Sequence, residues 1–396
     1  MHQDAMSSMR ILHVIGTRDI YGAERVVHGL ARALILCGND VGILCSPNLA
    51  GFFRTTGAEI HPFVLGGPGH FLGTMALTHL QDRFDIINLH GLSASIICAL
   101  APILSSKCVM TAHGSEVQLL NEKWLNFMER FTRKCVWRTA RRANRIIAIS
   151  TSGARGLSQF RKKLSIVFNG IDPHMITSLA WQNRDSARWL DRLKESGSAC
   201  LLFPGRLSIR LKGQDVMIRA LASLKQEGVK CYLILAGGGE DLSRLQALAG
   251  ELGVSELVFF LGYLPRGAQL AHVANSDIVI THLAQPRFEG ISQVHLEATL
   301  LKKPIITMVN KDLEVLKENL FMVRAPDHEE VASRIRHVLE HPREARKRAN
   351  QGARIVEETF SWAQVVHCYL ETYSNIAYAR GDPPDHLMHT NITSGT

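Results

Sequence analysis

Short apolar segments alternate with segments of helical pattern along most of the chain. The first apolar segment is RILHVIG at Arg10–Gly16, and a glycine-bearing turn separates it from AERVVHGLARAL, whose Val26, Val27, Leu30 and Leu34 share one helical face. Further apolar segments of the same kind follow at residues 40–46, 84–91, 107–114, 145–150 and 165–172. Continuously apolar strands that alternate with helices predict a parallel sheet covered by helices on both faces.

The pattern begins again after a polar stretch at residues 178–198. Apolar segments then recur at residues 199–207, 231–239, 257–264, 276–283 and 303–309. We therefore expect an α/β protein with two Rossmann-like, doubly wound parallel-sheet domains, at residues 9–175 and 198–355. Residues 356–378 carry a helical stripe of Val365, Tyr369, Tyr373 and Ile376, and residues 379–396 have the composition of a disordered tail.

Composition limits the class of protein. The chain of 396 residues is 46% hydrophobic, enough for two cores, and its formal charge of +9 favours an anionic partner such as a nucleotide, a phospholipid surface or a nucleic acid. An ordinary, slightly basic enzyme is the alternative. No two of the eight cysteines form a Cys-x-x-Cys pair, so free thiols in a reducing compartment are expected rather than disulfides or a zinc site.

Membrane-spanning and secretory segments are not evident in the sequence. The longest apolar segment, SASIICALAPIL, is shorter than the ~18 residues that a spanning helix needs. The first apolar segment, ILHVIG, is too short for a signal peptide. We expect a cytoplasmic protein.

Ligands of open parallel sheets bind at the carboxyl ends of the strands, so the loops that follow each strand are the candidates for chemistry. Two such sheets that face each other are expected to form one deep cleft. The loop PGRLSIRLKG carries Arg206 and Lys212, two cations suited to a diphosphate, although a solvated basic loop is the alternative. In LAGGGED, Gly237, Gly238 and Gly239 allow backbone to approach a phosphate or a base, and a tight strand-to-helix turn is the alternative.

The segment RFEGISQVHLEATLLKKPII places Glu289 and Glu297 eight residues apart. Ser292 is the expected N-cap of a helix whose N-terminus favours phosphate. Glu297 is expected roughly 7–8 Å along that helix. The two carboxylates suit the hydroxyls of a nucleotide sugar, whereas a surface glutamate and an ordinary helix glutamate are the alternative.

Two histidines of the first domain follow predicted strands, His90 in LHGLSAS and His113 in TAHGSE. A lone histidine is more often a packing or capping residue, but the loop of His113 is expected to face the cleft. The chain has no Asp-x-Asp, His-x-His or His-Glu-x-x-His motif, so we expect no obligatory metal at the diphosphate. Arg206 and Lys212 are expected to neutralise the leaving group instead.

Several of these segments resemble one enzyme family in order and spacing. FPGRLSIRLKGQDVMIRAL, LILAGGGED, FFLGYL and EGISQVHLEA are similar to segments of the retaining glycosyltransferases of the GT4 family, which has the GT-B fold. The resemblance covers residues 9–378 and is strongest from Phe203 to Thr307. It implies an acceptor-side first domain, a nucleotide-sugar-binding second domain and a C-terminal helix that crosses back to the first domain.

The resemblance also implies roles for individual residues. Glu289 corresponds to a catalytic residue at the donor sugar's hydroxyls, Glu297 contacts the ribose, and His113 lies near the reacting sugar. Arg206 and Lys212 hold the diphosphate. Further donor contacts are implied for Gly22 in a donor-facing loop of the first domain, for Gly238, and for the backbone of Gly290, Ile291 and Ser292.

The chain departs from the family pattern at three places. Lys302 stands where the family commonly has glycine, which costs up to ~1 kcal/mol if φ is positive there. The following segment MVNKDLE lacks the family's Gly-Gly loop, and THLAQPRFE before Glu289 is longer than usual. These departures leave the donor sugar open.

The predicted function is a metal-independent transfer of a sugar from a nucleotide-diphosphate sugar to a hydroxyl acceptor with retention, in polysaccharide or glycolipid biosynthesis. The nucleotide sugar is the donor substrate, the acceptor is a carbohydrate or a lipid-linked molecule, and neither a further cofactor nor nucleic acid is expected. The alternatives are a nucleotide-sugar epimerase, hydrolysis by two carboxylates, and a non-catalytic nucleotide-sugar-binding scaffold. The cationic loops disfavour hydrolysis, because a glycosidase has no diphosphate to hold.

Residues 123–145 predict a second kind of contact. They carry eight basic residues and one acidic residue, and Trp124, Met128, Phe131 and Cys135 form one helical stripe. Such a helix suits the anionic inner face of a membrane, which would make the protein peripheral there. The alternative is a helix that packs its stripe on the sheet and leaves its charges in water.

Overall fold

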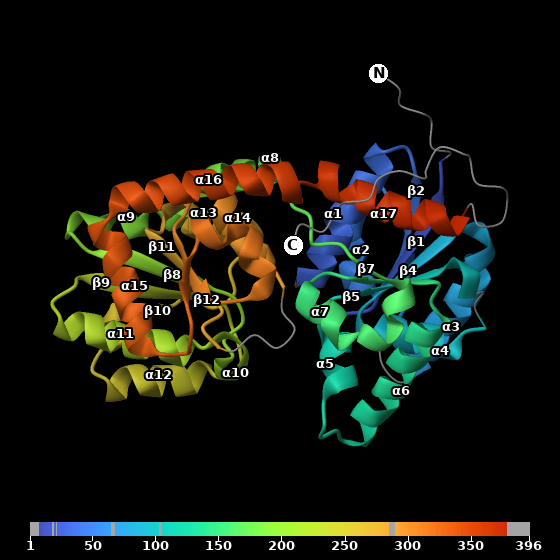
Figure 1. The fold of residues 1–396 in the computed structure, drawn as a ribbon, viewed down its shortest axis with the longest axis horizontal. Helices are drawn as coiled ribbons and strands as arrows, with labels where there is room; N and C mark the ends of the chain where they lie inside the picture. Colours follow the sequence, from blue (N-terminus) through green and yellow to red (C-terminus); the bar gives the residue numbers. More distant parts are fainter. Residues whose placement is uncertain are drawn as a thin grey trace. The chain divides into compact units, whose positions relative to one another are not determined.

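The computed structural model describes residues 8–17, 20, 22–64, 68–102, 105–284 and 290–377, which form two compact units (Figure 1). The first unit combines the chain up to Ala148 with Leu157–Val167 and the chain from Val366 onward. The second unit combines Ile149–Gly156 with Phe168–Val365, so residues 168–175 group with the second sheet. The tail predicted at residues 379–396 lies outside the described residues.

The first unit contains a parallel sheet in the order β3-β2-β1-β4-β5-β6-β7. Its strands are β1 (Arg10–Ile15), β2 (Asp40–Cys45), β3 (Glu59–Pro62), β4 (Ile86–His90), β5 (Cys108–Ala112), β6 (Arg145–Ala148) and β7 (Leu164–Ile166). Successive strands first add on one side of β1 and then, from β4, on the other. This reversal between β1 and β4 is a topological switch point, the place where open α/β sheets bind ligands.

The second unit repeats this topology with the order β10-β9-β8-β11-β12-β13, again entirely parallel. Its strands are β8 (Ala199–Pro204), β9 (Cys231–Ala236), β10 (Val258–Phe260), β11 (Ile278–Thr281), β12 (Ile305–Met308) and β13 (Phe321–Val323). The switch point lies between β8 and β11. Two doubly wound parallel sheets are the fold class that the alternating pattern predicted.

Helices connect the strands in both units. In the first unit they are α1 (Gly22–Leu36), α2 (Pro47–Arg54), α3 (Pro68–Leu80), α4 (Gly91–Leu100), α5 (Ser115–Asn121), α6 (Phe127–Arg142) and most of α17 (Trp362–Ala377). In the second unit they are α7 (Thr151–Gly156), α8 (Pro173–Gln182), α9 (Trp189–Glu195), α10 (Ile209–Lys212), α11 (Gln214–Gln226), α12 (Leu242–Glu251), α13 (Arg266–Asn275), α14 (Gln293–Leu300), α15 (His328–Glu340) and α16 (Pro342–Phe360). None of the helices in the described residues combines the length and the apolar character needed to cross a bilayer.

Alternate residues of the second sheet enter two different cores, because successive side chains of a strand point to opposite faces. In β8, Leu201 and Phe203 pack with the core under α11, α12 and α15. Cys200 and Leu202 pack with the core under α8, α13, α14 and α16. Figure 1 shows these two groups of helices on the two faces of the sheet. Burial on both faces explains why apolar and polar residues do not alternate along these strands.

Two edge strands, β3 and β13, were not predicted. β3 has the sequence EIHP, and none of its four residues is buried. β13 has only three residues, FMV, which is too short to show a period. The exposed edge strand β3 lacks the apolar signal that identified the other strands, whereas β13 is apolar but too short to be recognised.

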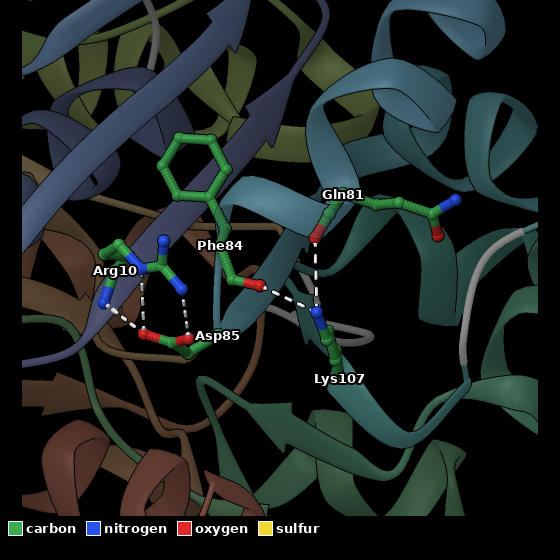
Figure 2. A network of polar contacts seen from close by, with 5 residues as sticks. All are labelled: Arg10, Gln81, Phe84, Asp85 and Lys107. Atoms are coloured by element: carbon green, nitrogen blue, oxygen red, sulfur yellow. Dashed lines mark hydrogen bonds and ion pairs between the residues drawn. The ribbon is translucent and has the colours of Figure 1, made fainter.

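At the amino ends of the strands of the first sheet, polar groups bond to one another, as Figure 2 shows. The backbone N–H of Arg10 donates to Asp85 Oδ2 over 2.8 Å, and Arg10 Nη2 lies 3.1 Å from Asp85 Oδ1. Burial raises the pKa of Asp85, but the hydrogen bonds and charge of Arg10 outweigh it and lower that pKa overall. Lys107 Nζ donates to the carbonyl oxygens of Phe84 and Gln81. This network joins the starts of β1, β4 and β5, at the opposite end of the sheet from His90 and His113.

The stripe predicted for the last helix is confirmed. Val365, Tyr369, Tyr373 and Ile376 are each at most 5% exposed. Within the first unit, Asn88 Nδ2 donates to the Tyr373 hydroxyl over 2.6 Å, which ties α17 to β4. The cysteines are free thiols, and only Cys37 and Cys368 are exposed.

Candidate active site

The loops that follow β8 and β11 meet at the switch point of the second sheet. Leu283 donates its backbone N–H to the carbonyl oxygen of Lys212 over 2.8 Å, and Lys212 Nζ contacts His282 Nε2. For this contact the Nε2 atom must be the unprotonated nitrogen of a neutral ring, since an ammonium only donates. Lys212 is therefore held by the neighbouring loop at the carboxyl end of the sheet, where a ligand is expected.

Gly213 makes this meeting of the two loops possible. Its φ is +75°, in the left-handed region that favours glycine. A Cβ atom at this position would lie 2.6 Å from the backbone nitrogen of Ala284. The close approach of the two backbones explains why glycine follows Lys212 in the sequence.

Arg206, the second predicted cation, pairs with a carboxylate of the next loop. Its Nε lies 3.0 Å from Glu240 Oε2, and its side chain is 59% exposed. Hydrogen bonds from the backbone of Glu240 and from Ser208, followed by Arg206, lower the pKa of Glu240. Glu240 keeps the guanidinium oriented, and an incoming phosphate would have to compete with it for Arg206.

The three glycines after β9 have different requirements. A Cβ atom on Gly237 would lie 1.9 Å from the carbonyl oxygen of Gly205, and one on Gly239 would lie 2.1 Å from that of Leu207. The protein's own loop therefore requires these two glycines. Gly238 alone faces open space, while its carbonyl accepts a 3.0 Å hydrogen bond from the Leu207 N–H. Of the three, Gly238 leaves room for an approaching ligand.

Helix α14 begins as predicted, with Ser292 as its N-cap. The Ser292 side chain accepts from the His295 N–H, and the His295 ring returns a contact to the Ser292 backbone. His295 Nε2 also lies 2.8 Å from Thr281 Oγ1 and 3.1 Å from Thr307 Oγ1, so one buried ring joins β11, β12 and the start of α14. His282 stacks on His295 with ring centroids 5.3 Å apart, which links Lys212 to the N-terminus of the helix.

The residues just before this helix are partly described. Glu289 lies outside the described residues. Gly290 is buried, and a Cβ atom there would lie 2.4 Å from the Cβ of Ser150. Ile291 is 2% exposed and belongs to the core under α14. Packing within the second unit thus explains the glycine at position 290 and the apolar side chain of Ile291. Only the backbone of these two residues is a candidate donor contact.

Glu297 is buried in α14 at 1% exposure. Arg266 Nη2, from the first turn of α13, lies 2.6 Å from Glu297 Oε1. The contact is an ion pair without hydrogen-bond alignment, because neither carboxylate oxygen has a hydrogen-bond partner in the described part of the chain. A buried carboxylate costs free energy unless it is compensated, so Arg266 stabilises it while its acceptor capacity stays unused.

In the first unit, His90 ends β4 and His113 directly follows the neighbouring strand β5. Gly91 and Gly114 follow them with φ of +83° and +106°, which turns the chain directly into a helix. Glu116 holds both turns: its carboxylate accepts from the Gly91 N–H over 2.8 Å and from the His113 N–H over 3.1 Å. Burial raises the pKa of Glu116.

The other predicted contact of the first unit, Gly22, is less constrained. Gly22 is the first residue of α1, it is exposed, and nothing lies within 4 Å of a Cβ atom built on it. Its role as a donor contact stays a prediction.

Two family profiles match the chain one after the other. "Glycosyltransferase Family 4" matches residues 20–174, and "Glycosyl transferases group 1" matches residues 188–356. The chain belongs to the GT4-type glycosyltransferases. The resemblance that the motifs indicated is therefore confirmed.

Individual relatives agree with this assignment. The glycosyltransferase is 25% identical to glycogen synthase of Mycobacterium tuberculosis over an alignment of 406 positions, which covers 92% of each chain. It is 37% identical over 99 residues to the GDP-mannose-dependent alpha-(1-6)-phosphatidylinositol monomannoside mannosyltransferase of Mycolicibacterium smegmatis, 24% of this chain and 26% of that one. The crystal structure of Anabaena HepE with UDP-glucose matches with a TM-score of 0.75 at 20% identity, over 93% of this chain and 100% of that one. These likenesses support the GT-B fold.

Three residues at the site of this glycosyltransferase were not predicted from its sequence: His282, His295 and Arg266. His282 directly follows β11, and the rule that ligands meet the carboxyl ends of strands could have selected it. Its φ of +37° is strained for a residue with a side chain, which is common at functional sites. Arg266 comes from a different helix, and only the fold brings it to Glu297.

Lys302, which stands where the family commonly has glycine, has a positive φ. Its φ is +56°, the left-handed conformation in which the family's glycine would be unstrained. Retaining lysine there costs about 1 kcal/mol.

Proposed function

We propose that this glycosyltransferase moves a sugar from a nucleotide-diphosphate sugar to a hydroxyl acceptor with retention of anomeric configuration and without a metal ion. The observation that carries the proposal is the position of Lys212, whose ammonium contacts His282 at the switch point of the second sheet. A positive charge there suits the diphosphate leaving group.

Three other features support a nucleotide sugar. Arg206 extends from the same loop as Lys212, and the backbone at Gly238 is open to a ligand. The N-terminus of α14 adds a positive dipole. Anabaena HepE has been solved with UDP-glucose, and the mycobacterial mannosyltransferase depends on GDP-mannose, so relatives use different bases.

The donor can be identified directly. Thermal-shift measurements with UDP-, GDP- and ADP-sugars should give one base and sugar with a clear rise in Tm, because a ligand that binds only the folded state stabilises it. A ligand at 100 times its Kd stabilises the protein by about 2.7 kcal/mol. The selected donor is then incubated with carbohydrate and lipid-linked acceptors, and NMR of the product reads the anomeric configuration. No shift with any nucleotide sugar would contradict the proposal.

The same experiment separates the alternative functions. A nucleotide-sugar epimerase would form a new nucleotide sugar from the donor alone, without an acceptor. A binding scaffold would show the thermal shift without any product. The cations and the helix N-terminus at the switch point favour transfer, because these groups stabilise charge that develops on a departing diphosphate.

We further propose that α6 docks on an anionic membrane surface and brings the enzyme to a lipid-linked acceptor at the inner face of the membrane. The predicted stripe is divided in the structure: Cys135 is buried, whereas Trp124, Met128 and Phe131 are 89%, 64% and 42% exposed. Phe127, at the start of the helix, is 83% exposed. Packing therefore accounts only for Cys135, and the stripe predicted from Trp124 is shorter in the structure, because Trp124 precedes the start of α6 at Phe127.

Exposed cations lie beside these apolar side chains. Lys134, Arg138 and Arg141 are exposed on α6, whereas Arg142 is fixed by a 3.0 Å hydrogen bond to the Ala101 carbonyl at the end of α4. Apolar side chains flanked by cations are complementary to anionic lipid.

Vesicle binding tests this surface. Wild-type protein should sediment with phosphatidylglycerol vesicles at low salt and be released as ionic strength rises. Changing Lys134, Arg138 and Arg141 together to glutamate should weaken partitioning by about 100-fold or more, since each basic residue contributes about 1 kcal/mol. The matched control reverses Arg343, Arg346 and Lys347, which are exposed on α16 of the second unit, and should bind as wild type does. Equal loss in both triple variants, or no binding by wild type, would contradict membrane docking.

A further inference from the structure

Three histidines form a continuous series on one face of the first sheet. His13 belongs to β1, His90 ends β4 and His113 follows β5, so the series crosses the switch point between β1 and β4. His13 and His90 are fully buried, and His113 is partly exposed. Buried polar rings in a parallel sheet are costly unless they are hydrogen-bonded.

The rings are joined nitrogen to nitrogen. His13 Nδ1 lies 3.0 Å from His90 Nε2, and His90 Nδ1 lies 2.9 Å from His113 Nε2. Burial lowers the pKa of His13 to about 3, that of His90 well below its ordinary value, and that of His113 to about 4. All three rings are therefore neutral at pH 7. In the described residues no three metal-binding side chains converge on one point, so these contacts are hydrogen bonds.

A series of neutral rings has coupled tautomers. Each ring has one N–H and one lone pair, so each contact needs a donor on one side and an acceptor on the other. Either all three rings carry the proton on Nδ1, or all three carry it on Nε2. The proton position in His113 is thus set by the two rings behind it.

The buried end of the series decides between these two states. His13 Nε2 is buried and has no hydrogen-bond partner among the described residues. With the protons on Nε2, this atom would be a buried N–H without an acceptor, which is rare in native proteins. With the protons on Nδ1, it keeps only an unused lone pair. The Nδ1–H state is therefore favoured.

We propose that His13 and His90 are positioning residues that hold His113 in the Nδ1–H tautomer, so that His113 donates a hydrogen bond from Nδ1 to a substrate oxygen. Glu116 supports this geometry by fixing the backbone at Gly91 and His113. The substrate part of the proposal rests on the proposed transferase function, whereas the tautomer is a property of the protein alone.

Long-range ¹H–¹⁵N NMR of the histidine-labelled protein tests the tautomer without substrate. The chain has 18 histidines, and the spectrum of a His113→Gln variant identifies the His113 signals by their loss. We expect a protonated Nδ1 and a bare Nε2 in wild-type His113. A proton on Nε2, or an equal mixture of the two tautomers, would overturn the proposal whether or not transferase activity is found.

Two substitutions of His90 separate positioning from packing. In His90→Asn, the amide nitrogen takes the place of Nδ1 and still donates to His113, whereas His90→Leu removes the donor. The leucine variant should show mixed His113 tautomers and a kcat about tenfold lower, the equivalent of one hydrogen bond. The asparagine variant should keep the wild-type tautomer and most of kcat. Equal kcat and equal His113 spectra in both variants would overturn the positioning role.

Discussion

Replacing Lys212 by alanine is expected to lower kcat about 100- to 1,000-fold, with a smaller change in KM for the donor, because removal of one preorganised charge or donor at the developing negative charge has an effect of this size. The ammonium of Lys212 is compact and contacts His282 Nε2, while the Leu283 N–H fixes the backbone of Lys212 by donating to its carbonyl oxygen. Charge on the diphosphate increases as the glycosidic bond breaks, so the interaction is strongest in the transition state. Initial-rate kinetics with the donor found by thermal shift measure this effect.

Arg210 provides the matched control for Lys212. It is an exposed cation on the same short helix, α10, and Arg210→Ala removes the same charge from the loop. We expect its kcat to stay within about twofold of wild type, since exposed charges are screened by water and salt. Equal losses in the two variants would mean that only the overall charge of the loop matters. A wild-type activity abolished by EDTA and restored by magnesium would also contradict Lys212 as the main partner of the leaving group.

Most central strands could be predicted because both faces of each sheet are buried. β1, β8 and β11 consist almost entirely of apolar residues, and each is followed by a glycine or a polar turn. The edge strand β3 lacks that signal, and β13 is apolar but only three residues long. The start of α14 was also predictable, because an N-cap serine is a local feature of the sequence.

The partners of the site residues could not be predicted, because they come from distant parts of the chain. The phosphate contact of Arg206 stays a prediction, and its ion pair with Glu240, from the next loop, was not foreseen. Glycines at 237 and 239 were interpreted as room for a ligand, but the backbone at Gly205 and Leu207 fills that room. A glycine-rich segment predicts that another group lies close to its backbone. Only the fold shows whether that group is a ligand or another part of the protein.

Removing the carboxylate of Glu297 is expected to destabilise the second unit strongly. Glu297→Ala leaves Arg266 without its partner at a site where Arg266 is only 22% exposed. Breaking a buried ion pair on one side costs about 3–5 kcal/mol, and the residual exposure of Arg266 favours the lower end. Urea unfolding of the whole chain, monitored by circular dichroism, should show a transition at a lower urea concentration in this variant than in wild type.

The double variant Glu297→Leu with Arg266→Leu separates stability from ligand binding. Replacing both charges by apolar side chains of similar volume is often neutral, so most of the lost stability should return. Donor affinity should not return if Glu297 contacts the ribose, because its carboxylate oxygens have no other hydrogen-bond partner among the described residues. Titration calorimetry with the donor measures this second quantity. If the double variant binds the donor as wild type does, Glu297 acts only through Arg266. If the double variant is as unstable as Glu297→Ala, the broken ion pair is not the source of the instability.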